Sequence, residues 1–237
     1  MRYLTGVYWC RGRLARENQD SVVLLQGLTA RGRVLTAVCD GMSGLAQGEV
    51  ASGYVTERLQ EWFYEGLLYA VRKKKPYWVI RRSLDRLTFD MQQQLQQYAV
   101  REEIALGTTM TVLVVWEQTY LVWHLGDSRL YRMRGRHMEQ VTGDHIRQRE
   151  QLTKCVGSFG YYVPEHHMGV LRQGEGMLLC SDGFRNCVAG KELQEALRPG
   201  QIREEAQIER RLTEIGKICM KRGERDNLSA VYLKVER

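Results

Sequence analysis

Helical and strand-like patterns occupy separate blocks of this chain, and that order restricts its fold most. Residues 46–101 repeat apolar side chains every three to four positions, which predicts two long amphipathic helices, and Pro76 can begin the second. Strand-like runs precede this block and return densely over residues 108–142, where short turns separate them. Neighbouring strands joined by short turns pair antiparallel. Because helices and strands do not alternate, we expect a layered α+β domain and not a doubly wound parallel sheet.

The remaining expected elements follow from the same patterns. The early strands are expected at residues 3–9, 21–26 and 34–39, hairpin tips at 117–118 and 135–136, a last helix at 203–221 and a closing strand at 227–235.

Composition indicates one domain, over residues 1–237. The chain has 237 residues, 43% of them hydrophobic, with only 3 prolines and no Ser/Gly-rich linker. The formal net charge of +7 favours anionic partners without naming one. The six cysteines form no CxxC pair, so we expect reduced thiols. Without a secretory signal or an apolar run of membrane length, we expect a soluble, cytoplasmic protein that is monomeric and has no membrane partner.

Several carboxylates stand where an apolar run meets a polar turn. Asp40 ends the run "VLTAVCD" and precedes Gly41, and Asp182 ends "GMLLCSD" and precedes Gly183. Further acids at such edges are Asp20, Asp127, Asp144 and Asp226. A single Asp-Gly pair is most often a turn, but several strand-end acids together predict one shared site. Carboxylate and carbonyl oxygens suit Mg²⁺ or Mn²⁺ better than zinc.

Eight short motifs carry a family resemblance. "RENQD", "DGMSG", "GEVAS", "GTTMT", "GDSR", "TGDH", "SDGF" and "RDN" occur in the order typical of the metal-dependent serine/threonine protein phosphatases, the PPM or protein phosphatase 2C family. The match runs from about Arg16 to Val235, and the form of the motifs resembles bacterial members. No single motif is specific, but eight in order are very unlikely to occur by chance.

The resemblance implies a fold and a reaction. The family fold is a four-layer αββα sandwich, in which two antiparallel sheets are flanked by helix pairs. Its active site holds two Mn²⁺ or Mg²⁺ ions, and a metal-activated water hydrolyses phosphoserine and phosphothreonine in proteins. The expected partners are phosphoprotein substrates and an opposing serine/threonine kinase.

The resemblance also assigns roles to individual residues. Asp40 matches the metal-bridging aspartate, and Gly41 matches the glycine whose carbonyl binds one ion. Asp182 and Asp226 match ligands of the other ion, and Asp20 matches the acid that holds a metal or its water. The expected catalytic and metal set is therefore Asp20, Asp40, Gly41, Asp182 and Asp226.

The chain departs from the family pattern around this set. Ala15 stands where the phosphate-binding arginine is usual, so Arg16 or Arg13 is expected to replace it. Gln19 replaces a common glutamate, and Met42 stands where animal members carry a histidine proposed as general acid.

Two departures concern a third ion and the substrate groove. Asp127 matches a ligand of a third metal whose partner is here Asn186, so that site is expected to be weak. The flap segment, around residues 145–175, is shortened, so substrate specificity does not transfer.

Two other functions stay open. A catalytically weak or silent family member could act as a regulatory binding module, although four retained acids argue against it. Residues 72–82, "RKKKPYWVIRR", combine six basic residues with Tyr77 and Trp78, which can bind nucleic acid. We consider nucleic acid the weaker possibility, and expect a solvated helix junction with its aromatics turned inward.

The histidines are expected to be structural. We expect His145 to fix a loop, and His166 and His167 to form a solvated pair.

Overall fold

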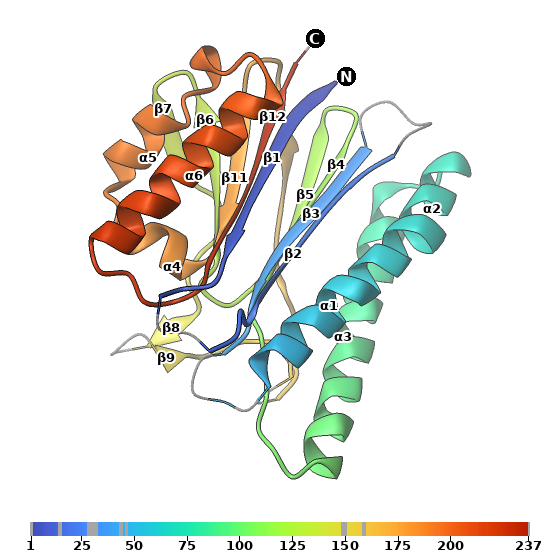
Figure 1. The fold of residues 1–237 in the computed structure, drawn as a ribbon. Coiled ribbons are helices and arrows are strands. Elements are labelled where there is room, and N and C mark those ends of the chain that lie inside the picture. The colour runs from blue at the N-terminus through green and yellow to red at the C-terminus, as the bar shows by residue number, and fades with distance from the viewer. Residues whose placement is uncertain are drawn as a thin grey trace.

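The computed structural model describes residues 2–13, 16–27, 33–42, 45, 47–147, 151–157 and 160–236. Two five-stranded antiparallel sheets face each other, and helices cover both outer faces (Figure 1). The strand orders are β1-β12-β11-β6-β7 in one sheet and β10-β5-β4-β3-β2 in the other. This arrangement confirms the expected α+β sandwich.

The strands are β1 (Tyr3–Cys10), β2 (Asp20–Gln26), β3 (Arg33–Asp40), β4 (Met110–Trp116), β5 (Thr119–Leu125), β6 (Arg129–Arg134), β7 (His137–Gln140), β8 (Ile146–Arg147), β9 (Gln151–Leu152), β10 (Glu165–Val170), β11 (Gly176–Cys180) and β12 (Leu228–Val235). The helices are α1 (Gly48–Trp62), α2 (Leu68–Arg72), α3 (Tyr77–Arg101), α4 (Asp182–Arg185), α5 (Gly190–Ala196) and α6 (Glu205–Lys221). A π-helical turn (Phe63–Leu67) joins α1 to α2, and a 3₁₀ turn (Pro199–Gln201) precedes α6.

The helical block forms the two long helices that its periodicity predicts. Their junction falls at the basic turn, and Pro76 stands immediately before α3, where its fixed φ suits a helix start. Both expected hairpin tips are confirmed, because β4–β5 and β6–β7 pair directly across them. The helices α4 and α5, the β8–β9 hairpin and β10 are not among the elements that the sequence patterns predicted.

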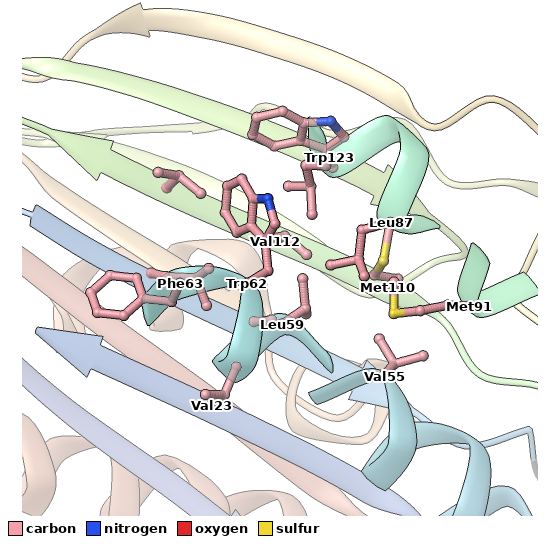
Figure 2. Close-up of a cluster of buried hydrophobic side chains, with 14 of the residues drawn as sticks. Val23, Val55, Leu59, Trp62, Phe63, Leu87, Met91, Met110, Val112 and Trp123 are labelled. Atoms are coloured by element: carbon pink, nitrogen blue, oxygen red, sulfur yellow. The ribbon is translucent and has the colours of Figure 1, made fainter. Parts of the chain in front are cut away.

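Apolar layers lie on both faces of each sheet. Figure 2 shows Leu59 and Trp62 of α1, with Met91 of α3, packed against Val112 and Trp123 of the sheet beneath them. A separate cluster between the two sheets includes Leu179 and Val231. Burial on both faces explains why β3 reads as an almost continuous apolar run.

Two further expectations can be compared with the structure. All six cysteines are free thiols, as expected. Within the described residues, no helix has the length and apolar character needed to cross a membrane.

Candidate active site

Strand pairing brings the candidate acids to one end of the sandwich. In the antiparallel register of β2 and β3, Asp20 lies directly opposite Asp40. In the other sheet, the end of β11 pairs with the starts of β6 and β12. Asp182 follows β11, whereas Asp127 and Asp226 precede β6 and β12, so all three lie at that same strand end.

Backbone contacts hold Asp40 in place. The side-chain hydroxyl of Thr109 accepts a hydrogen bond from the amide of Asp40 at 2.9 Å, and the amide of Thr109 donates to the Asp40 carbonyl at 2.8 Å. Gly41 follows in a narrow position, because a Cβ there would stand 2.5 Å from the Gly48 carbonyl oxygen and 2.6 Å from that of Gln19. Only glycine fits this approach without moving the backbone around the acid.

Burial and mutual repulsion dominate the electrostatics of Asp20 and Asp40. Asp20 is buried, with an exposed fraction of 1%. Burial, then Asp226 and Asp182, raise the pKa of Asp20 to about 7, and the nearby hydroxyls of Ser229 and Ser181 oppose this shift although neither forms a hydrogen bond with the carboxylate. Burial and then the carboxylates of Asp20, Asp182 and Asp226 hold the pKa of Asp40 well above its usual range. The acids are therefore close enough to disfavour one another's ionisation.

The acids of the other sheet belong to the same electrostatic cluster. Burial and then the Asp182 carboxylate raise the pKa of Asp226. The same two causes raise the pKa of Asp127 to about 6. Arg185 opposes the shift at Asp127. Such a group of carboxylates needs compensating positive charge.

The acids offer free ligand atoms for a cation. Among the described residues, buried carboxylate oxygens without a hydrogen-bond partner include both oxygens of Asp20 and Oδ1 of Asp182. Buried unpaired carboxylate oxygens are costly unless a cation binds them. No three aspartates of the described chain bring their oxygens within 4.8 Å of one another. Carboxylate oxygens are ligands that suit hard cations such as Mg²⁺ or Mn²⁺.

A cleft of about 800 Å³ opens beside Asp226. Two exposed arginines, Arg16 and Arg225, contribute to its lining, together with Gln19 and Glu49. The Gln19 amide donates to the Glu49 carboxylate at 3.3 Å, so Gln19 holds the start of α1. Among the described residues that line the cleft, Arg16 and Arg225 are the cationic side chains.

The other residues expected near the phosphate lie elsewhere. Arg13 is exposed and outside the lining of this cleft. Ala15 falls outside the described residues. Met42 is half-buried, and its amide donates to the Gly107 carbonyl at 2.9 Å.

Arg185 lies beside Asp127 and Asn186. Its Nη2 donates to the Asp127 carbonyl at 3.2 Å, and its Nη1 donates to Oδ1 of Asn186 at 3.0 Å. Asn186 in turn donates to Oδ2 of Asp182 at 3.3 Å. A cationic side chain therefore supplies part of the charge that Asp127 requires.

Arg129 pairs with Asp144 and not with the acid cluster. Its guanidinium makes a bidentate ion pair with the Asp144 carboxylate, the shortest contact being 2.6 Å. Hydrogen bonding to Arg129 lowers the pKa of Asp144 despite its burial. Asp144 is thus a structural partner of Arg129, although the sequence pattern grouped it with the other strand-end acids.

A histidine and glutamate group forms a further candidate metal site. Ligand atoms of His124, His145 and Glu165 lie within 4.8 Å of one another. The Gly126 amide donates to Nδ1 of His145 at 3.1 Å, so Nε2 carries the proton and faces Glu165 at 3.3 Å. A cation could bind this ring only after one of those contacts is broken.

The same contacts confirm the expected structural role of His145. Its amide donates to the Gly126 carbonyl at 2.8 Å, while its ring accepts from the Gly126 amide. His145 therefore fixes the turn that carries Asp127. Burial lowers the pKa of the stacked His124 ring to about 4, which keeps it neutral.

Two expectations about exposure are wrong. His166 and His167 are not a solvated pair, because His166 bonds to Asp85 at 2.7 Å and His167 bonds to Glu165. Tyr77 and Trp78 do not turn inward, since they are 48% and 57% exposed. Both residues precede Ile80, the first buried position of α3.

Several residues at the site were not predicted from the sequence. Arg225 directly precedes Asp226, and Arg185 follows the "SDG" motif, so a basic residue beside an expected ligand was the available signal. Gly12 and Gly183 allow close backbone approach to the Asp226 turn, with Cβ positions 2.1 and 2.2 Å from carbonyl oxygens. The sequence pattern points to Gly183, which follows Asp182, but no local pattern distinguishes Gly12 from an ordinary turn residue.

Comparison with known proteins identifies the family. The family model described as protein phosphatase 2C matches residues 15–230. Protein phosphatase PhpP of Streptococcus pneumoniae is 24% identical over 203 residues, which cover 78% of this chain and 80% of that protein. Serine/threonine protein phosphatase PstP of Mycobacterium tuberculosis is 27% identical over 245 residues, covering 95% of this chain and 43% of that protein.

Solved structures share the fold. The crystal structure of serine/threonine phosphatase Stp1 from Staphylococcus aureus superposes with a TM-score of 0.86 at 23% identity, covering 100% of this chain and 96% of that one. The chain belongs to the protein phosphatase 2C family, the metal-dependent serine/threonine protein phosphatases, and is of the bacterial type.

Proposed function

We propose that the aspartate cluster binds two divalent ions, Mn²⁺ or Mg²⁺, and hydrolyses phosphoserine and phosphothreonine in protein substrates. The supporting observation is the set of buried, uncompensated carboxylate oxygens on Asp20 and Asp182. The proposed ligands are Asp20, Asp40, the Gly41 carbonyl, Asp182 and Asp226. When bound, paired divalent ions lower the pKa of water and stabilise the charge that develops during an in-line displacement at phosphorus.

The protein's own part in this reaction is positioning. Asp40 interacts electrostatically with acids of both sheets, and the Thr109 contacts fix its backbone. Gly41 leaves its carbonyl accessible without a side chain in the way. Asp20 approaches from β2, the strand that pairs with β3 in the same sheet, whereas the proposed ligands Asp182 and Asp226 come from the other sheet.

The phosphate needs cationic side chains beyond the ions. Arg16 and Arg225 line the cleft beside Asp226 and can reach an incoming phosphate. We propose them as phosphate-binding residues, with the more distant Arg13 as the weaker choice. Because Met42 has no titratable group, leaving-group protonation falls to a water at the site or remains unassisted.

A strong third metal site does not fit the residues present. Arg185 contacts the Asp127 backbone, and Asn186 replaces a carboxylate at the neighbouring position. Any third ion at Asp127 would be weakly held. We therefore propose two ions per active site.

The cysteines indicate the compartment in which we expect the protein to act. Six free thiols suit a reducing compartment such as the cytoplasm. We propose a monomer of one domain, with a shortened flap, that opposes a serine/threonine kinase.

Removing Asp40 tests this proposal. The purified protein should hydrolyse p-nitrophenyl phosphate and a phosphothreonine peptide with Mn²⁺ or Mg²⁺, and lose this activity in EDTA. Asp40→Ala should abolish turnover, whereas Asp90→Ala, on the exposed face of α3, should retain it.

Stability measurements separate loss of chemistry from loss of fold. Without metal, Asp40→Ala should unfold at the same or a higher temperature, because repulsion among the acids decreases. Unfolding of this variant, seen by circular dichroism, would contradict the assigned role. A folded wild type without turnover in either metal would favour the silent binding module.

A further inference from the structure

Strand β10 is an outer strand of its sheet. The amide of Leu171 donates to the Gln118 carbonyl at 2.7 Å, directly after the β10–β5 ladder. Bonded and non-bonded pairs alternate along an antiparallel ladder. The backbone groups of His166, Met168 and Val170 therefore point away from β5, toward the open edge.

Most of this edge lacks a partner within the described chain. The Val170 carbonyl accepts a hydrogen bond from Arg132. The outward amides and the carbonyls of His166 and Met168 make no hydrogen bond to other described residues. Open edges of this kind can accept an extended segment as an added strand.

An apolar hollow of about 450 Å³ lies beside this edge, on the face of the sheet that α3 covers. Its apolar lining comes from β4, β5, β10 and the start of α3: Trp116, Leu121, Met168, Val170, Pro76 and Tyr77. Met168 and Val170 are 56% and 50% exposed. We call the open edge of His166–Val170 and this hollow together the β10 groove. It can take the alternate apolar side chains of an added strand.

Positive charge surrounds the β10 groove. Lys75 contributes to its lining, and the exposed Lys73 and Lys74 directly precede it. These lysines have no ion pair with any described residue, and Glu117 is the acid of the lining. The charge favours an acidic occupant. It opposes a second copy of this chain, which carries the same lysines and a formal net charge of +7.

The β10 groove lies away from the aspartate cluster. Trp116, which lines the groove, pairs with Arg33 at the start of β3. Asp40 lies at the other end of β3. At 3.3 Å per residue, the two ends of β3 are about 23 Å apart. Figure 1 shows the β4–β5 tip at the end of the molecule opposite the β8–β9 hairpin. An occupant of the groove would therefore leave the catalytic cleft open.

We propose that the β10 groove docks an extended acidic segment of a partner protein, which adds to the sheet as a strand and inserts apolar side chains into the hollow. The interaction would hold the phosphatase on its partner independently of phosphate binding.

Fluorescence anisotropy can test this docking with the full chain. The probe is a labelled peptide in which valine alternates with aspartate or glutamate, and the control peptide has lysine at the acidic positions. Met168→Pro removes an outward amide without removing a bond to β5, so the fold should tolerate it. We expect it to weaken binding at least tenfold, whereas Met168→Ala, which keeps the amide, weakens it less than threefold. Lys74→Glu with Lys75→Glu should also weaken binding at least tenfold.

Each contrary result rejects the proposal. Circular dichroism first confirms that the variants are folded. Failure of the wild type to bind the acidic peptide at about 1 mM, or equal binding by Met168→Pro, would overturn docking at this edge. Tighter binding of an oligothymidine probe, lost in the lysine variant, would assign the surface to nucleic acid. A dimer in sedimentation that Met168→Pro abolishes would assign it to a second copy.

Discussion

At the scale of single residues, Asp20 carries an electrostatic cost that a bound cation would relieve. Its pKa of about 7 in the metal-free fold exceeds the usual value of an unfolded aspartate, near 3.9. The folded state therefore binds more protons than the unfolded state between about pH 4 and 7, and stability falls as the pH rises through this window. The penalty reaches on the order of 4 kcal/mol above pH 7.

Asp20→Asn should reduce that pH dependence. In EDTA, the melting temperature of the wild type should fall from about pH 4 to 7, while that of the variant stays flatter. Thermal unfolding followed by circular dichroism at each pH measures this difference. Parallel curves would show that Asp20 ionises normally in the folded protein.

Individual roles were predictable to different degrees. The acids could be named from the sequence because each follows or precedes an apolar run, which is a local signal. Arg185 and Arg225 could not be placed, because their neighbours lie on other strands and loops.

At the scale of elements, the start of α4 packs directly on the turn before β12. A Cβ on Gly183 would stand 2.2 Å from the Asn227 carbonyl oxygen and 3.2 Å from Cβ of Asp226. Gly183→Ala should therefore displace the turn that carries Asp226. We expect a loss of stability of about 1 to 3 kcal/mol and weaker Mn²⁺ binding.

Gly190, at the start of α5, offers a matched control. A Cβ there meets only the end of the Met138 side chain, at 3.5 Å, so Gly190→Ala should keep or slightly raise stability. Urea unfolding in EDTA and titration with Mn²⁺ measure both variants. Equal behaviour of the two alanine variants would show that the close approach at Gly183 has no energetic consequence.

At the scale of the whole molecule, the apolar layer between the sheets holds the two halves of the site together. Leu179 is fully buried in this layer. Leu179→Ala should cost about 2 to 5 kcal/mol of unfolding free energy, because it leaves a cavity between two rigid sheets. Val100→Ala, at the exposed end of α3, should change stability by less than about 0.5 kcal/mol. Denaturant unfolding measures both, and similar values would contradict a shared core.

The sequence by itself determined the order of helices and strands, both hairpin tips and the acids at the strand ends. These features depend on local periodicity and turn chemistry, which short segments carry in full. The tertiary structure alone decided how Asp20 faces Asp40, which side chains surround Asp127, and that Tyr77 and Trp78 are exposed. It also decided that β10 leaves an open edge. Such features depend on the packing of residues far apart in the chain, and no local pattern records which segments meet.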